Sequence, residues 1–166
     1  MIRLDRYSTQ GFDRGASALK EAAWILVKWF FFLTPLPWPS AVRCALLRAF
    51  GAEVGSGVVI RGNVNITFPW RLRIGSDVWI GEEVLVLSLA QVTIESNVCI
   101  SQRAFLCTGS HDFGKETFDL IAQPIVVAKA RGLRRWPSSG LGSKSGRGVA
   151  WLRAQWFRRA CLLRAR

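Results

Sequence analysis

Aliphatic residues recur every six positions between residues 54 and 106, and this spacing restricts the possible folds more than any other feature of the sequence. Three triplets follow it: Val54, Ile60 and Ile66, then Ile74, Ile80 and Val86, then Ile94, Ile100 and Leu106. A second apolar set lies two residues earlier, at Val58, Val64, Val78, Val84, Val98 and Ala104. A period of six fits neither an α-helix nor an ordinary hairpin and is typical of the hexapeptide repeat of a parallel β-helix. Each coil of such a fold is a triangle of three short strands, and coils must stack to bury their aliphatic side chains.

The repeat predicts a mainly β protein, a left-handed parallel β-helix over residues 53–127 with the aliphatic side chains inside the prism. Glycine follows three of these aliphatic residues, at Gly55, Gly75 and Gly81. We expect these glycines at the corners of the coils, where a positive φ favours a residue without a Cβ. A sandwich of short strands is the alternative, but it does not account for three triplets with the same spacing.

Residues 1–52 lack the repeat and are expected to form an arm followed by helices. Residues 1–20 are polar, and we expect an extended arm that lies on the body of the protein. The apolar pattern of residues 18–34 predicts a helix that ends before Pro35.

A second helix is predicted over residues 41–50. Ser40 is placed to cap its first turn, and Gly51 is placed to end it.

The apolar run Ala22–Trp38 is too short to span a bilayer, which needs about 20 apolar residues. It also contains Lys28 and is broken by Pro35 and Pro37. We therefore expect a buried or interfacial amphipathic helix, with membrane contact at most peripheral. The first residues do not show the basic-then-apolar layout of a signal peptide, and we expect a cytoplasmic protein.

Positive charge is concentrated at the C-terminal end, although the formal net charge of the whole chain is +12. Residues 1–127 hold 12 basic and 11 acidic residues, whereas residues 128–166 hold 11 basic residues and no acidic one. The hexapeptide pattern also stops at this boundary. We interpret residues 128–166 as an irregular tail produced by a reading-frame shift near Val127. The alternative is a genuine basic tail that binds nucleic acid or acidic lipid.

The frame-shift hypothesis can be checked against codon arithmetic. If the third base of each codon is joined to the first two bases of the next, Trp136-Pro137 requires alanine and Trp156-Phe157 requires valine. The permitted residues for 128–146 include a string with hexapeptide spacing. Without the tail the chain is nearly neutral, so we predict no nucleic-acid partner for the β-helix itself.

The four cysteines, Cys44, Cys99, Cys107 and Cys161, form no CxxC pair. Their spacing predicts neither a zinc site nor a disulfide framework. We expect reduced thiols, as in cytosolic proteins.

Residues 107–124 interrupt the repeat and carry His111, the one histidine of the chain. A long excursion from a rigid scaffold is a frequent place for function. A neutral imidazole can take a proton from a hydroxyl near neutral pH, so His111 is our candidate general base. The alternative is a histidine with an ordinary structural role.

Other chemistries fit the sequence less well. A zinc site of the kind found in β-helical carbonic anhydrases needs three histidines, and one histidine per chain does not supply them. No GxSxG motif is present, and Ser110 beside His111 is a poor nucleophile pair because adjacent side chains rarely align. We predict no metal.

The residues around this excursion resemble a known family. The segment from Ile100 to Phe113, then Phe118-Asp119-Leu120-Ile121 and Pro124-Ile125-Val126-Val127, closely resembles the colanic acid biosynthesis acetyltransferases of the WcaF type. The segment from Leu47 to Gly55 resembles their first helix and coil. The resemblance covers roughly residues 20–127.

The resemblance implies an O-acetyltransferase that moves an acetyl group from acetyl-CoA to a sugar hydroxyl in exopolysaccharide biosynthesis. It implies direct attack without an acyl-enzyme, and a homotrimer with active sites between subunits. His111 matches the family histidine, and the neighbouring Asp112 is expected to orient the ring or the sugar. Ser88 stands where many relatives carry Asn and is expected to bind the sugar.

The resemblance also implies that later coils build much of the acetyl-CoA site, so the sequence assigns no residue to that site. The alternative functions are a catalytically impaired homologue that acts as a scaffold, and a nucleic-acid or membrane-surface binder that uses the basic tail. Binding of acetyl-CoA distinguishes the enzyme from the first, and salt-dependent binding through the tail would indicate the second.

Overall fold

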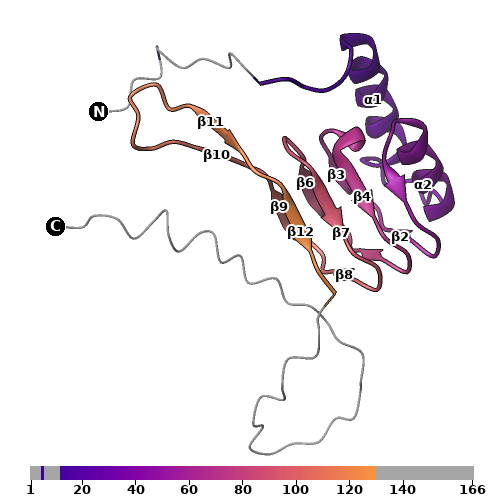
Figure 1. Ribbon diagram of the computed structural model, residues 1–166. Helices are drawn as coiled ribbons and strands as arrows, with labels where there is room; N and C mark the ends of the chain where they lie inside the picture. Colours follow the sequence, from indigo (N-terminus) through magenta and orange to yellow (C-terminus); the bar gives the residue numbers. More distant parts are fainter. Residues whose placement is uncertain (1–4, 6–11, 130–166) are drawn as a thin grey trace, which may run out of the picture. The chain divides into compact units, whose positions relative to one another are not determined.

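A computed structural model describes Asp5 and residues 12–129, and these residues contain a left-handed parallel β-helix (Figure 1). Its strands form three parallel sheets, ordered β1-β4-β7-β12, β2-β5-β8 and β3-β6-β9. The strands are β1 Glu53–Val54, β2 Val59–Ile60, β3 Asn65–Ile66, β4 Leu72–Ile74, β5 Trp79–Ile80, β6 Leu85–Leu87, β7 Val92–Ile94, β8 Cys99–Ile100, β9 Phe105–Cys107 and β12 Ile125–Val127. The fold predicted from the repeat is therefore confirmed.

The register shows why the six-residue spacing works. Ile60 pairs with Ile80, and Ile80 pairs with Ile100, so consecutive coils have the same length. The predicted aliphatic side chains from consecutive coils therefore stack in columns. The buried members of the two sets are Val58, Ile60, Val64, Ile66, Ile74, Val78, Ile80, Val84, Val86, Ile94, Val98, Ile100 and Leu106. Val54 and Ala104 pack partly buried against the same core.

The reason expected for the glycines after the aliphatic residues was wrong. Gly55, Gly75 and Gly81 do not have a positive φ. They are needed because stacked coils approach closely, and a Cβ on Gly75 would lie 2.5 Å from the backbone nitrogen of Ser96. The left-handed positions lie three residues after an aliphatic residue instead, at Gly57, Asn63, Asp77, Glu83, Asn97 and Arg103.

Glu83 and Arg103 occupy equivalent left-handed positions in consecutive coils. The Arg103 Nε donates to Glu83 Oε2 at 2.7 Å. This hydrogen bond and the opposite charge lower the pKa of Glu83 and raise the pKa of Arg103. Both side chains are exposed, so the pair contributes little to stability.

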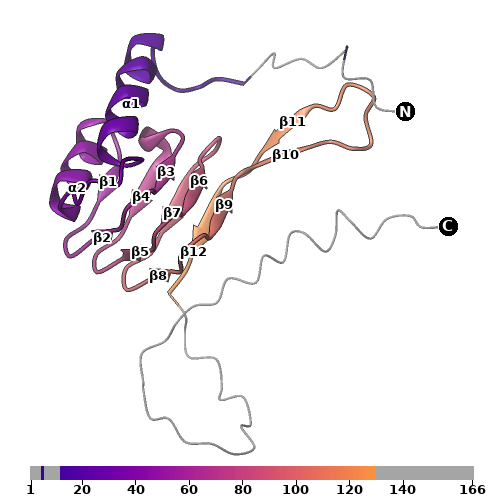
Figure 2. The ribbon, with the colours of Figure 1, turned by 180° about the vertical axis from the view of Figure 1, so that it is seen from behind.

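Helix α1 (Ala18–Phe31) packs at the end of the prism that holds the first coil (Figure 2). The Ser17 hydroxyl accepts from the Lys20 nitrogen and caps the first turn. The helix ends before the predicted residue 34, because the nitrogens of Phe32 and Leu33 both donate to the Lys28 carbonyl. The proline at position 35 also disfavours a helical residue before it.

The inner face of α1 is pinned to the prism. Trp24 is buried, and its indole nitrogen donates to the Ile66 carbonyl at 3.0 Å. The Trp24 ring also contacts the rings of Phe32 and Phe50. These contacts close the first coil with large side chains, which a solenoid needs at its end.

Helix α2 (Ser40–Ala49) follows, and Gly51 ends it with a φ of +98° as predicted. The predicted cap by Ser40 was wrong, because Ser40 is the first residue of the helix and its hydroxyl bonds the nitrogen and carbonyl of Ile60. The buried Arg43 also donates to the Ile60 carbonyl and to the Phe31 carbonyl. This arginine therefore ties both helices to the first coil.

Half of the predicted N-terminal arm, residues 1–4 and 6–11, lies outside the described residues. Of its described part, the Arg14 carbonyl accepts from the Trp70 indole at 2.7 Å, and the Asp13 carbonyl accepts from Arg71. These bonds hold residues 13 and 14 on the prism. Within Asp5 and residues 12–129, no helix is long and apolar enough to cross a membrane. Residues 130–166, which contain almost all of the predicted irregular tail, lie outside the described residues.

Candidate active-site hairpin

The chain leaves the prism after β9 and forms an antiparallel hairpin of β10 (Gly109–His111) and β11 (Leu120–Ala122) (Figure 1). Arg73 pairs with Thr93, and one coil of ordinary length separates them. Thr93 pairs in turn with Val126, and the coil between these two residues is longer because it includes the hairpin. The hairpin is therefore an insertion into one coil. It lies within residues 107–124, the segment that was expected to interrupt the repeat.

Thr108 anchors the base of the hairpin. Its buried hydroxyl donates to the Leu87 carbonyl at 2.7 Å and accepts from the Ala90 nitrogen at 3.0 Å. Its carbonyl accepts from the Gln123 nitrogen at 2.9 Å, which joins the two arms of the hairpin. A rigid coil therefore holds the base of a segment whose outer part projects from the prism.

His111 is the last residue of β10, and its half-buried ring lies against Phe118. The two rings are parallel within 5°, with centroids 4.3 Å apart. The Nδ1 atom lies 3.0 Å from the Phe118 carbonyl oxygen. Because a carbonyl only accepts hydrogen bonds, this contact assigns the proton of the neutral ring to Nδ1. The Nε2 atom then carries a lone pair that can accept a proton.

Phe118 holds the imidazole in this position and was not singled out from the sequence as a site residue. Its φ is +51°, a left-handed conformation that a bulky residue rarely adopts. In this conformation both the ring and the carbonyl of Phe118 contact His111. Phe113 packs edge-on against the Phe118 ring, with centroids 5.2 Å apart. A left-handed phenylalanine leaves no sequence signal, although its place in an irregular loop was visible.

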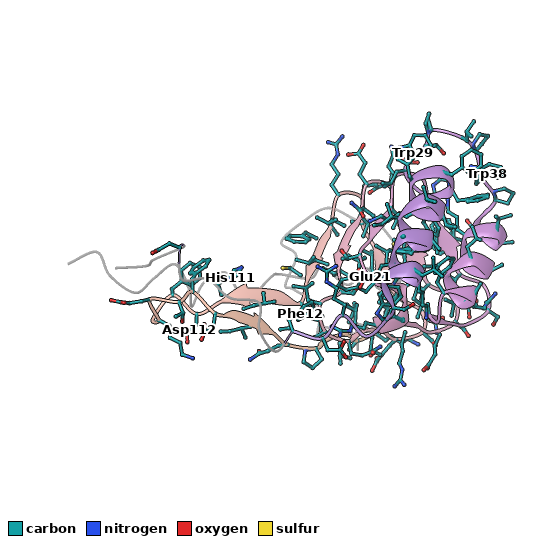
Figure 3. All side chains as sticks on the ribbon, turned by 90° about the horizontal axis from the view of Figure 1, so that it is seen from above. Phe12, Glu21, Trp29, Trp38, His111 and Asp112 are labelled. Atoms are coloured by element: carbon teal, nitrogen blue, oxygen red, sulfur yellow. The ribbon has the colours of Figure 1, made fainter. Side chains whose placement is uncertain are left out.

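Asp112 follows His111, and its described hydrogen bond is to the turn. Its Oδ1 accepts from the Gly114 nitrogen at 2.9 Å and so shapes the outer end of the hairpin. Figure 3 labels His111 and Asp112 together in this outer part, away from the helices. His111 and Asp112, which are neighbours in the sequence, therefore share the outer part of the hairpin.

Ser88 lies apart from these two residues, inside the prism. It is fully buried, and its hydroxyl accepts from the Phe68 nitrogen and donates to the Phe68 carbonyl, both at 2.9 Å. These bonds join two consecutive coils. They give Ser88 a structural role, and the buried hydroxyl has no surface to offer a sugar.

Charged groups also shape the hairpin. Lys115 Nζ donates to Asp119 Oδ2 at 2.9 Å across the loop between β10 and β11. This bond lowers the pKa of Asp119 and raises the pKa of Lys115. Within the described residues, no three His, Cys, Asp or Glu side chains converge as a metal site. Cys44, Cys99 and Cys107 are free thiols, and Cys161 lies outside the described residues.

The chain resembles known proteins in sequence and in structure. The chain is 41% identical over 133 residues to the putative colanic acid biosynthesis acetyltransferase WcaF of Escherichia coli K12, and equally to that of Shigella flexneri. The match covers 78% of this chain and 71% of each relative. No family model matches.

A crystal structure of a hexapeptide-repeat-containing acetyltransferase from Vibrio cholerae superposes with a TM-score of 0.56 and 25% identity. The superposition covers 67% of this chain and 65% of that one, so the chain spans slightly less than two thirds of the solved structure. The sequence match and the shared β-helix agree. The chain belongs to the family of WcaF-type acetyltransferases, which are hexapeptide-repeat acyltransferases.

Proposed function

We propose that this protein is an O-acetyltransferase that moves an acetyl group from acetyl-CoA to a sugar hydroxyl in exopolysaccharide biosynthesis. The names of its relatives support the reaction and the pathway class. The observation that carries the proposal within this chain is the contact between His111 Nδ1 and the Phe118 carbonyl. It leaves Nε2 as the nitrogen able to act as a general base.

The proposed step uses His111 as a proton carrier. Nε2 takes the proton of the acceptor hydroxyl while its oxygen attacks the thioester carbonyl of acetyl-CoA. The carbon–sulfur bond then breaks, and the leaving sulfur takes the proton from the imidazolium, so the products are an acetyl ester and free CoA thiol. The Phe118 carbonyl stabilises the imidazolium through the hydrogen bond to Nδ1.

Asp112 is proposed to contact the acceptor sugar. One of its carboxylate oxygens is used by the Gly114 nitrogen, and a carboxylate has capacity for further hydrogen bonds from sugar hydroxyls. We do not extend the sugar-binding proposal to Ser88, because both hydrogen-bonding functions of its buried hydroxyl are used by Phe68.

The proposed assembly is a cytoplasmic homotrimer. The support from this chain is that the hairpin projects from its own prism (Figure 1). A base at the outer end of such a hairpin has little of its own prism around it. A neighbouring copy would supply the second wall of the site.

The same proposal covers the tail. We infer that residues 128–166 are read in a shifted frame, because the repeat and the acidic residues stop together near residue 127. Sequencing of the gene and intact mass of the expressed chain test this inference. A single uninterrupted frame with a mass that matches the printed sequence would contradict it. Acetyl-CoA binding by the chain with this tail would contradict the alternative that the tail makes the protein catalytically impaired.

Acetyl transfer to de-O-acetylated exopolysaccharide fragments tests the reaction, in the chain as written and in a version with the frame restored after residue 127. We expect His111→Ala to reduce transfer by about 10²–10⁴-fold, the usual contribution of a general base. Arg61→Gln is the matched control, because Arg61 is an exposed residue on the prism paired only loosely with Glu82. Full activity of His111→Ala with unchanged assembly would refute the role of His111.

A further inference from the structure

The outer face of α1 is apolar and faces solvent. Leu19, Leu26 and Trp29 expose 82%, 70% and 64% of their surface, and Ile25 and Phe30 are exposed beside them. The opposite face is apolar too, because Trp24, Val27 and Phe31 pack against the core. A helix that is hydrophobic all round is normally buried on every side. In this chain half of α1 is not buried.

The exposed side chains form one continuous surface. Positions 19, 22, 25, 26, 29 and 30 fall on one side of a helix with 3.6 residues per turn. Together these side chains expose several hundred Å² of apolar surface, in the range of the largest apolar patch of a typical monomer, about 300–600 Å². We call this surface the α1 apolar face.

The chemistry of the α1 apolar face fits a lipid better than a protein. Its exposed side chains offer a single hydrogen-bonding group, the indole nitrogen of Trp29. A protein interface of this size carries roughly one hydrogen bond per 100–200 Å² and a polar rim. A lipid surface needs neither, and Trp and Phe are favoured at the level of the headgroups.

The α1 apolar face carries little negative charge. Helix α1 contains two basic residues, Lys20 and Lys28, and one acidic residue, Glu21, and the Lys20 Nζ lies over the Trp70 ring. Glu21 is largely covered and is paired with Arg14 at 2.9 Å. Lys28 lies at the edge of the face, half-buried along α1, and a long basic side chain can extend its charge toward headgroups while its stem stays in apolar surroundings. No uncompensated carboxylate of this segment opposes an anionic surface.

We propose that the α1 apolar face docks on the surface of a lipid bilayer, with α1 lying in the interface and the prism outside it. The inference is independent of the proposed acetyl transfer. The helix has 14 residues and is too short to span a bilayer, which agrees with the absence of a membrane-crossing helix in the described part of the chain.

Vesicle sedimentation of the full chain tests the proposal. The basic residues 128–166 would bind anionic vesicles by themselves, so the measurement uses phosphatidylcholine vesicles in about 1 M salt, where the Debye length is near 3 Å. We expect the full chain to bind the vesicles. Leu26→Glu should weaken this binding by about tenfold or more, because a charged side chain replaces a leucine that enters the bilayer. The matched control is Trp79→Glu, since Trp79 is 58% exposed on the prism and lies outside the α1 apolar face.

A second measurement locates Trp29 directly. Brominated phosphatidylcholine quenches tryptophan fluorescence within the bilayer, and Trp29→Phe keeps the face apolar while removing one fluorophore. We expect quenching of the unmodified chain, weaker quenching of Trp29→Phe, and equal sedimentation of both. Equal quenching of the unmodified chain and of Trp29→Phe would overturn the proposal. An equal loss of vesicle binding in Leu26→Glu and Trp79→Glu would overturn it as well. So would a chain that ignores vesicles and forms a dimer that Leu26→Glu dissociates, because the face would then be a protein interface.

Discussion

Gly75→Ala should destabilise the β-helix because stacked coils leave no room for a methyl group at this corner. The added Cβ would lie 2.5 Å from the nitrogen and hydroxyl of Ser96 and 2.8 Å from its Cα. Normal contacts between such atoms are about 3.5 Å or longer. Two of the three neighbours are backbone atoms, so no rotation of a side chain can relieve the contact.

Relief requires the two coils to separate locally by about 1 Å, given that normal contact distance. The Gly75 nitrogen donates to the Ile94 carbonyl at 2.8 Å, and the Ser76 nitrogen donates to the Ser96 hydroxyl at 2.9 Å. Separation would weaken both bonds, each worth about 0.5–1.5 kcal/mol net. We therefore expect a loss of about 1–3 kcal/mol, which also agrees with overpacked cores. For a chain of this size that loss lowers Tm by roughly 3–10 °C.

Gly62→Ala is the matched control. A Cβ on Gly62 has no atom within 4 Å, and its φ is not positive. This substitution should leave stability unchanged or raise it by about 0.4–1 kcal/mol through the unfolded state. Thermal and urea denaturation of the two variants and the parent compare them directly. Equal midpoints for Gly75→Ala and Gly62→Ala would refute the close-approach explanation.

Two further predictions concern the interior of the prism and its thiols. Ser88→Ala should lower the free energy of unfolding by about 1–3 kcal/mol, because it leaves the Phe68 nitrogen without its partner, whereas the Phe68 carbonyl keeps the Arg71 nitrogen at 3.2 Å; urea denaturation measures the change. An unchanged midpoint would mean that Phe68 finds other partners. Alkylation at neutral pH should label Cys99 before Cys44, because Cys44 is buried and its burial raises the pKa of the thiol; peptide mapping by mass spectrometry records the order, and faster labelling of Cys44 would contradict it.

The repeat predicted the strands and their stacking because spacing along the sequence decides which side chains point into the prism. Ile60, Ile80 and Ile100 each lie six positions from the next inward aliphatic residue of their coil, and they pair with one another because every coil repeats that spacing. The purpose of the glycines was not predictable in the same way. The close approach of Gly75 to Ser96 depends on the distance between two stacked coils, and the six-residue period does not predict that distance.

The candidate site was predicted in part for a related reason. His111 and Asp112 stand out because they lie in the segment that breaks the repeat. Phe118 does not stand out, because its effect depends on a backbone conformation that few phenylalanines adopt. Ser40 and Ser88 were assigned local or ligand-binding roles, whereas their hydroxyls bond the backbone of residues far away in the sequence, Ile60 and Phe68. Single side chains that join distant segments in this way are recognised only once the coils are placed.

The return of β12 onto β7 has a consequence for how this enzyme family can change. Thr93 meets Val126 in the same column that Arg73 and Thr93 share, so the prism continues as if the hairpin were absent. Length changes in the hairpin therefore alter how far the imidazole reaches while every column keeps its alignment. In the proposed reaction, insertions and deletions at this one point of the chain would then change the size of the acceptor that reaches His111 without changing the stability of the prism.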